Sequence, residues 1–116
     1  MEIKKIIEKE VAILTLKGNF LCEPDKIKLR DKVYGLMDDN VKNVILDLGK
    51  VDCVNSEGLG TLVMALTSLR KTGGDLRLAH VSDMVRKTLT ITQLVRIFEI
   101  YDTAEEAIAS YKIKRK

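Results

Sequence analysis

The chain has 116 residues, which suits one domain and leaves no room for a second. Hydrophobic residues make up 46% and charged residues 32%, a balance typical of a globular domain and not of a disordered or membrane-spanning chain. Aromatic residues make up only 4%, with no tryptophan, which argues against the stacking platforms that bind single-stranded nucleic acid.

The formal net charge is +3, and the positive excess lies at the C-terminus, where residues 112–116 read Lys-Ile-Lys-Arg-Lys. We expect a structured domain over residues 1–111, followed by a solvated basic tail over residues 112–116. Without this tail the domain is close to neutral, so we expect no direct contact with nucleic acid.

Cysteine usage and the N-terminus point to the cytoplasm. Cys22 and Cys53 form no CxxC pair, and a secreted disulfide framework of this size usually carries more cysteines. The N-terminal residues mix charges with isoleucines and contain no apolar core of an export signal. No apolar run approaches the roughly 18 residues that would span a bilayer, so no membrane association is expected.

The first third of the chain predicts a β-hairpin and a helix. Residues 3–7 and 11–17 have strand patterns on either side of Glu8-Lys9-Glu10. Glu23-Pro24-Asp25 opens a helix, because proline is tolerated in a first helical turn. The apolar face of this helix would consist of Leu29, Val33, Leu36 and Met37.

The middle of the chain predicts a strand–helix–strand unit. Residues 44–48 are nearly continuously apolar, as in a central strand covered on both faces, and we expect a short polar loop after them. Apolar residues then recur at helical spacing over residues 57–72 until Gly73-Gly74 ends the helix. Residues 76–79 return as a strand, and such a crossover makes the two strands parallel.

The last part of the chain predicts a helix, a short strand and a final helix. Ser82 would cap the first of these helices, with Val85 and Leu89 facing inward. Residues 97–100 predict the last strand, and Thr103 followed by Glu106 is a capping box for the final helix. That helix would bury Ala107, Ile108 and Tyr111. The predicted fold is a single small α/β domain: a mixed sheet, formed by an N-terminal hairpin and then parallel strands, packed by about four helices.

The most informative segment is Asn55-Ser56-Glu57-Gly58-Leu59-Gly60, at the start of the central helix. Serine is a preferred N-cap, so the Ser56 hydroxyl could accept a hydrogen bond from an unpaired backbone N–H. A helix N-terminus also favours negative charge, so the same hydroxyl could be a place where a phosphoryl group is added. The residues alone leave both roles open.

Enzymatic and metal sites find little support around this segment. Gly58-Leu59-Gly60 resembles the start of a dinucleotide-binding motif, but the third glycine position is Val63, and no P-loop follows. A serine hydrolase would need a glycine where Val54 stands, and His80 is the only histidine. One histidine and two distant cysteines offer no metal cluster. We therefore expect no catalytic residue, metal or cofactor, and a protein that is not an enzyme.

Over nearly its whole length the chain resembles the STAS domain family, and more narrowly the bacterial anti-sigma-factor antagonists. The most specific element is the family's Asp-Ser-(Ser/Thr)-Gly-Leu-Gly, to which residues 55–60 correspond. The resemblance implies a partner that is both an anti-sigma factor and a serine kinase, which phosphorylates Ser56. A PP2C-type phosphatase is a further implied partner. The implied partner-binding residues are Asn55, Ser56, Glu57, Gly58, Leu59 and Gly60.

The chain departs from the family pattern at three places. Asn55 replaces the usual aspartate, and Glu57 replaces the second hydroxyl residue. The family's earlier Gly-Glu-(Leu/Ile)-Asp is here Gly18-Asn19-Phe20-Leu21. Two acids of the family's recognition surface are therefore absent, and one new acid lies beside the serine.

The expected mechanism is a switch between two proteins. Unmodified, the surface around Ser56 would dock on the anti-sigma kinase and release a sigma factor. Phosphorylation would add about −1.5 to −2 charges, which the helix N-terminus tolerates and the interface does not. The free protein is expected to be a monomer. Two alternatives stay open: binding of a nucleotide or other anion at the helix N-terminus after Ser56, or a constitutive scaffold that is never phosphorylated, since Glu57 already supplies a charge.

Overall fold

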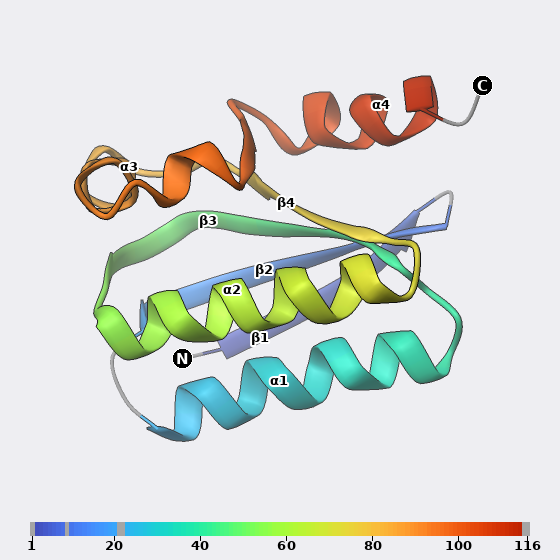
Figure 1. Ribbon diagram of the computed structural model, residues 1–116, viewed down its shortest axis with the longest axis horizontal. Helices are drawn as coiled ribbons and strands as arrows, with labels where there is room; N and C mark the ends of the chain where they lie inside the picture. Colours follow the sequence, from blue (N-terminus) through green and yellow to red (C-terminus); the bar gives the residue numbers. More distant parts are fainter. Residues whose placement is uncertain (1, 9, 21–22, 115–116) are drawn as a thin grey trace.

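The computed structural model describes residues 2–8, 10–20 and 23–114. These residues form five strands, four α-helices and one 3₁₀ turn, arranged around a single sheet (Figure 1). In chain order the elements are β1 (Glu2–Glu8), β2 (Val11–Phe20), α1 (Glu23–Asp38), β3 (Asn43–Val54), α2 (Ser56–Lys71), β4 (Asp75–Ala79), α3 (Asp83–Ile91), η1 (Leu94–Arg96), β5 (Glu99–Tyr101) and α4 (Ala104–Lys114).

The strands lie in the sheet in the same order as in the chain, from β1 at one edge to β5 at the other. β1 and β2 are antiparallel, with Glu2 opposite Lys17 and Glu8 opposite Val11. β2, β3, β4 and β5 are all parallel to one another. The predicted mixed sheet is confirmed. Because α1 follows β2 and α2 follows β3, the N-termini of both helices lie at the same end of the sheet.

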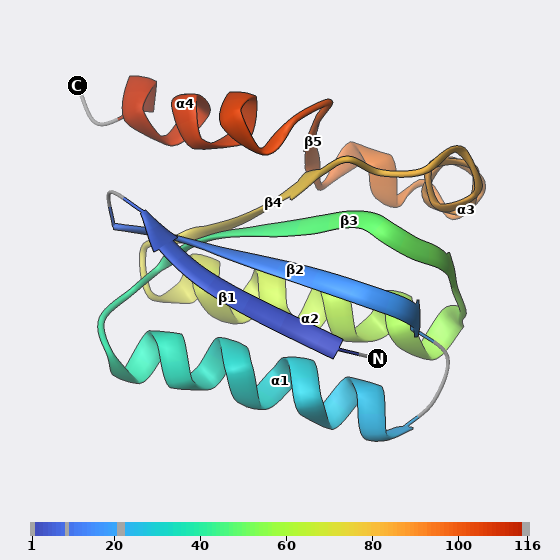
Figure 2. The same cartoon turned by 180° about the vertical axis from the view of Figure 1, so that it is seen from behind.

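Helices cover both faces of the sheet. α1 and α2 lie side by side on one face, and α4 lies on the other, as opposite views show (Figures 1 and 2). The larger core cluster lies beneath α1 and α2 and includes the fully buried Leu46 and Leu62. A smaller cluster beneath α4 includes Ile45 and Tyr111. Neighbouring residues of β3 thus enter opposite clusters, as expected for a central strand.

The predicted helix faces and caps are also confirmed. Ser82 is the N-cap of α3, and its hydroxyl accepts a hydrogen bond from the Val85 N–H at 3.3 Å. The Thr103 hydroxyl accepts from the Glu106 N–H at 3.1 Å at the start of α4. The residues predicted to face inward and found buried are Leu29, Val33, Leu36, Val85, Leu89, Ala107, Ile108 and Tyr111, and Met37 is half-buried.

Two predictions about the strands are wrong. The polar loop expected after residue 48 does not exist, because β3 continues to Val54. Val51 and Val54 are buried. A register shift between β2 and β3 lets the strand continue through the polar residues that precede Val51. The last strand is Glu99–Tyr101 and not residues 97–100, since the 3₁₀ turn delays its start and leaves Ile97 38% exposed.

Some predictions concern residues at the limits of the description. Leu21 and Cys22 lie outside the described residues, and Cys53 is a half-buried free thiol. α4 extends to Lys114, beyond the expected domain boundary at residue 111. The separate basic tail over residues 112–116 stays a prediction.

The attachment of α4 depends on a buried cation, Arg77 of β4, whose side chain is only 1% exposed. Its Nε lies 3.2 Å from Asp75 Oδ2, and its Nη1 donates to the Ser110 hydroxyl of α4. The guanidinium carbon lies 4.1 Å from the centre of the Tyr111 ring. α4 is therefore held by a charged and stacked network as well as by apolar packing.

Candidate functional site

The junction between β3 and α2 is capped by Asn55 and not by Ser56. Asn55 has an extended backbone, with φ −91° and ψ −178°, and its Oδ1 accepts a hydrogen bond from the Gly58 N–H at 2.8 Å. Its carbonyl accepts the first helical bond, from the Leu59 N–H at 2.9 Å. The structural interpretation of Ser56 as the cap is therefore wrong. Asparagine caps as well as serine does, and one residue earlier its side chain already takes that place.

Ser56 is the first residue of α2 and is exposed. Among the residues that the structure describes, none forms a hydrogen bond with its hydroxyl. The apolar stripe of the helix, including Leu59 and Leu62, faces the sheet and turns the serine outward. Ser56 is therefore accessible to a second molecule, and its modification would break no hydrogen bond with a described residue.

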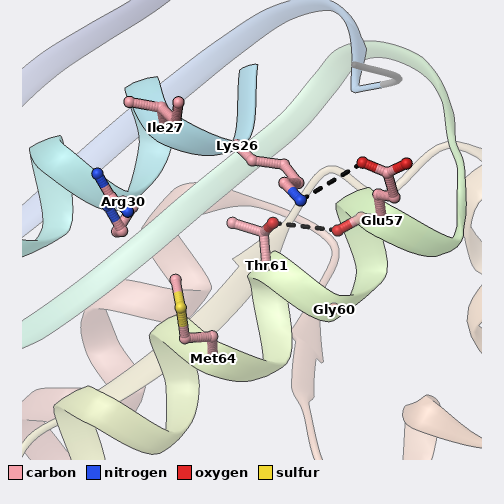
Figure 3. Close-up of a pocket in the computed structure, with 7 residues that line it drawn as sticks. All are labelled: Lys26, Ile27, Arg30, Glu57, Gly60, Thr61 and Met64. Carbon is pink, nitrogen blue, oxygen red and sulfur yellow. Dashed lines mark hydrogen bonds and ion pairs between the residues drawn. The ribbon is translucent and has the colours of Figure 1, made fainter. Parts of the chain in front are cut away.

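Glu57, the acid that replaces the family's second hydroxyl residue, takes part in a contact between helices. Its Oε1 lies 3.4 Å from the Lys26 Nζ of α1, and the two side chains are 56% and 32% exposed (Figure 3). An exposed pair of this kind contributes at most about 1 kcal/mol to stability. The carbonyl of Glu57 accepts a hydrogen bond from the Thr61 hydroxyl at 3.0 Å. Glu57, the residue after Ser56, thus pairs with a cation of α1.

A hollow of about 460 Å³ opens between the N-terminal halves of α1 and α2, and Glu57, the residue after the serine, lines it. We call it the α1–α2 hollow. Figure 3 shows its walls, which combine charged groups with the apolar side chains of Ile27 and Met64. The residues that line it are Lys26, Ile27, Arg30, Glu57, Gly60, Thr61 and Met64.

The six residues predicted for partner binding fall into two groups. Ser56, Glu57 and Gly60 are exposed, and Glu57 and Gly60 also line the α1–α2 hollow. Gly58 and Leu59 are buried, so they attach α2 to the sheet, and Asn55 is half-buried as the cap. The structure adds residues of α1 that the sequence did not identify.

Lys26 and Arg30 are the main additions to the site from α1. They are four residues apart, which places them on one side of the helix, but other charged residues of this helix have the same spacing. Only the packing of α1 against α2 shows which of these cations line the α1–α2 hollow together with Glu57 and Gly60.

His80 lies elsewhere, with its Nδ1 3.0 Å from Asp47 Oδ2. Within the described ranges, no group of three or more histidine, cysteine, aspartate or glutamate side chains is placed to hold a metal ion. A search of the same residues finds no helix with the length and hydropathy needed to cross a membrane.

Fold and site together define a small α/β domain with an exposed serine at the start of its central helix, whose hydroxyl forms no hydrogen bond with a described residue. The STAS domain family matches the chain over residues 2–107, so the chain belongs to that family and the resemblance is confirmed. It is 29% identical over 85 residues to BtrV of Bordetella bronchiseptica, with 73% of each chain covered. It is 36% identical over 73 residues to a Thermotoga maritima protein, with 63% of each chain covered. Both relatives are named as anti-sigma factor antagonists.

A solved structure gives the same result. A crystal structure from Thermotoga maritima, named as that of an anti-sigma factor antagonist, superposes on this chain with a TM-score of 0.86 at 27% identity. The superposition covers 93% of this chain and 92% of the other. The likeness therefore extends over the sheet and the helices on both of its faces.

Proposed function

We propose that the protein is an anti-sigma-factor antagonist, a switch that binds an anti-sigma factor with serine kinase activity and is inactivated by phosphorylation of Ser56. The observation that carries this proposal is the exposed Ser56 hydroxyl, which Asn55 relieves of the capping role. The names of the relatives support the partner class. A PP2C-type phosphatase would reverse the modification, and the cytoplasm is the compartment in which these partners meet.

The fold can tolerate a phosphate at this position. The first turn of a helix leaves N–H groups without intrahelical partners, and the helix dipole favours an anion there by about 1 kcal/mol at most on an exposed surface. The cap residue Asn55 is neutral, so the new charge meets no carboxylate on that side. On the other side, Lys26 can leave Glu57 and approach the phosphate.

The partner would not tolerate the same group. A dianion pressed into an interface without a matching cation loses hydration worth several kcal/mol. A loss of about 4 kcal/mol already lowers affinity about a thousandfold. Phosphorylation would therefore block the surface and leave the domain folded.

The surface offered to the partner has a defined composition. Ser56 and Gly60 form its helical part, and Ile27 and Met64 supply apolar walls beside them. A partner that covers both the α1–α2 hollow and the exposed first turn of α2 would contact Ser56, so a phosphate there would interfere with docking directly.

The decisive experiment supplies the purified protein with ATP and the anti-sigma kinase that co-purifies with it, followed by mass spectrometry of the phosphopeptides. We expect one phosphate, on Ser56, and none on the Ser56→Ala variant. Ser68, half-buried in the same helix, serves as the internal control. An unmodified Ser56 in the presence of a bound and active kinase would remove the phosphorylation switch from this proposal.

The two alternative functions predict different results. A free anion at the start of α2 would have to compete for Lys26 with the Glu57 carboxylate, which lies 3.4 Å from the Lys26 amino group. Calorimetric titration with ATP and GTP should give no micromolar binding if the proposal is right. A constitutive scaffold would bind its partner equally well before and after incubation with kinase and ATP.

A further inference from the structure

A second hollow, of about 540 Å³, lies around the N-terminal half of β1. We call it the lysine hollow, because five lysines and a single carboxylate line it. Its residues come from three strands and from α1: Glu2, Ile3, Lys4, Thr15, Lys17, Lys28, Lys32 and Lys50. It shares no residue with the α1–α2 hollow.

Lys4, Lys17, Lys32 and Lys50 carry a charge that no carboxylate of the described part of the domain neutralises by direct pairing. All five lysines of the hollow are exposed residues. No carboxylate of a described residue lies within 4 Å of the amino groups of Lys4, Lys17, Lys32 or Lys50. Lys17 and Lys50 even face each other as register partners on β2 and β3, an arrangement that like charges destabilise.

Protection of the sheet edge does not explain this cluster. Lysines on an edge strand discourage unwanted pairing, and that accounts for Lys4 of β1. It does not account for Lys28 and Lys32, which lie on a helix, or for Lys50, which lies on the central strand. A charge gathered from four elements indicates an acidic ligand.

The neighbouring strand edge specifies the shape of that ligand. β1 is an edge strand of the sheet (Figure 2). Among the described residues it pairs with β2 alone, so the backbone N–H and C=O groups along its other edge have no strand partner there. Six of its seven residues are exposed, Ile3 being half-buried. An exposed edge can bind an extended peptide by continuing the sheet, with specificity supplied by the side-chain surroundings.

We propose that the lysine hollow and the edge of β1 together bind an extended acidic segment of a protein partner. The segment lies along β1 as an additional strand, and its carboxylates face the lysines. The proposal does not depend on the function proposed for Ser56, because the two surfaces have no residue in common.

Other anionic occupants fit the hollow less well. The described residues that line it include no aromatic ring on which a base could stack and no arginine for bidentate phosphate binding. A membrane surface cannot follow a concave site. A second copy of the chain would bring the same lysines opposite one another, which like-charge repulsion opposes.

The test uses a fluorescent seven-residue peptide of alternating glutamate and valine, matched in length to β1. We expect saturable binding at about 50 mM salt that weakens steeply as salt is raised, since exposed charges are screened. Amide shifts in the NMR spectrum of the protein should concentrate on Glu2–Glu8 and not on α2. A peptide of alternating lysine and valine is the probe with reversed charge and should not bind.

Matched charge reversals locate the site. Lys4→Glu combined with Lys32→Glu should lower peptide affinity about tenfold or more. Lys71→Glu combined with Lys87→Glu changes the net charge equally, on exposed residues outside the lysine hollow, and should leave affinity within about twofold. Ser56→Ala should bind the peptide as the unsubstituted protein does, so the result is independent of the phosphorylation switch.

Two results would overturn the proposal. Equal loss of affinity in both double variants would show attraction by net charge and no site. Tighter binding of polyuridylate or of phosphatidylserine vesicles than of the peptide, abolished by the Lys4 and Lys32 reversals, would assign the hollow to nucleic acid or to a membrane instead.

Discussion

At the start of α2, one side chain caps the helix and its neighbour in the sequence is exposed to solvent. Asn55 accepts the Gly58 N–H at 2.8 Å, while the adjacent Ser56 is exposed. A serine that both capped the helix and accepted a phosphate would lose its hydrogen bond on modification. The division allows Ser56 to change chemically without loosening the helix.

This division predicts that two neighbouring alanine substitutions differ in their effect on stability. Asn55→Ala should lower the free energy of unfolding by about 1 kcal/mol, because the Gly58 N–H loses its acceptor. Ser56→Ala should change it by less than about 0.5 kcal/mol, as is usual for exposed sites without partners. Urea denaturation followed by circular dichroism measures both. A larger loss for Ser56→Ala than for Asn55→Ala would return the capping role to the serine.

Partner binding should depend on the charge at position 56. Ser56→Asp should weaken binding to the anti-sigma factor, toward the roughly thousandfold expected for a buried phosphate, because a carboxylate also loses hydration in the interface. Ser56→Ala should bind as the unsubstituted protein does. Calorimetry with the purified partner measures both affinities, and equal affinities for the two variants would contradict the blocking mechanism.

Gly60 offers a test of whether the motif serves folding or binding. A Cβ built on Gly60 meets no atom within 4 Å, so the fold does not require glycine there. Gly60→Ala should raise the free energy of unfolding by about 0.5–1 kcal/mol, since alanine is the better helix former. It should also weaken partner binding, because the added methyl group enters the α1–α2 hollow.

Gly35 of α1 is the matched control for this prediction. It is exposed, and a Cβ there also meets no atom within 4 Å. Gly35→Ala should stabilise the domain to a similar extent and leave partner affinity unchanged, since Gly35 does not line the hollow. Equal partner affinities for the two glycine variants would place Gly60 outside the interface.

The sequence predicted the central serine and its helix, but not the surface around them. Residues 55–60 are contiguous and follow a recognisable strand, so their position could be derived from pattern alone. The pairing of Lys26 with Glu57 could not, because it depends on the packing of α1 against α2. The sequence could not decide between Asn55 and Ser56 as the cap, because the two residue types have similar cap preferences. The dihedral angles of the structure identify Asn55.

At the scale of elements, α4 is attached through the Tyr111 hydroxyl as well as through apolar packing. That oxygen lies 2.8 Å from the Val44 carbonyl oxygen and 2.9 Å from that of Asp75, at the start of β3 and β4. Burial, reinforced by the Asp75 charge, raises the pKa of Tyr111 well above its usual value of about 10. The neutral hydroxyl therefore joins the final helix to the middle of the sheet.

This raised pKa predicts how stability falls in alkaline solution. The folded state holds the Tyr111 proton more tightly than the unfolded state, so its contribution is complete below about pH 10 and is lost as pH rises above that value. Burial also raises the pKa of Tyr101, which adds in the same direction. The free energy of unfolding, measured between pH 7 and pH 11, should therefore be flat and then decline.

Tyr111→Phe is the control for the alkaline decline. It should cost about 1–3 kcal/mol at neutral pH, because the carbonyl oxygens of Val44 and Asp75 lose the single hydroxyl proton that they share. Above pH 10 its stability should fall less steeply than that of the unsubstituted protein. Parallel pH profiles would show that Tyr111 does not carry the dependence.

Element types were predictable where apolar residues recur with a single period, as in α1 and α2. The length of β3 was not, because Gly49 and Lys50 interrupt the apolar run while the strand continues past them with a register shift. The burial of Arg77 was also beyond prediction, since an arginine in an amphipathic strand is expected to face water. Its partners on α4 are distant in sequence and come together only in the folded domain.

At the scale of the whole molecule, the parallel sheet brings chemistry to one end. The C-terminal ends of β2 and β3 lead into α1 and α2, so both helix N-termini lie at that end (Figure 1). The α1–α2 hollow lies between the N-terminal halves of these helices. The lysine hollow uses the first residues of β1, which pair with the end of β2 at the same end of the sheet. A single partner with an acidic flank could therefore contact both surfaces.

The same architecture predicts that phosphorylation switches binding without refolding the domain. Ser56 makes no hydrogen bond to a described residue, and the core beneath α2 begins with the buried Leu59 one turn further on. A phosphate added outside this core disturbs no packed side chain. Ser56→Asp, used as a stable mimic, should therefore change the free energy of unfolding by no more than about 1 kcal/mol.

Hydrogen exchange followed by mass spectrometry can distinguish surface blocking from refolding. In the phosphorylated protein, altered exchange should be confined to the first turn of α2 and the facing turn of α1, where Lys26 and Glu57 rearrange. Exchange in β3, β4 and the rest of α2 should stay unchanged, because their hydrogen bonds and core contacts do not involve the serine. Faster exchange across the sheet would mean that the charge is transmitted through the core. The switch would then act by changing the fold, and the loss of partner binding would no longer require a phosphate in the interface.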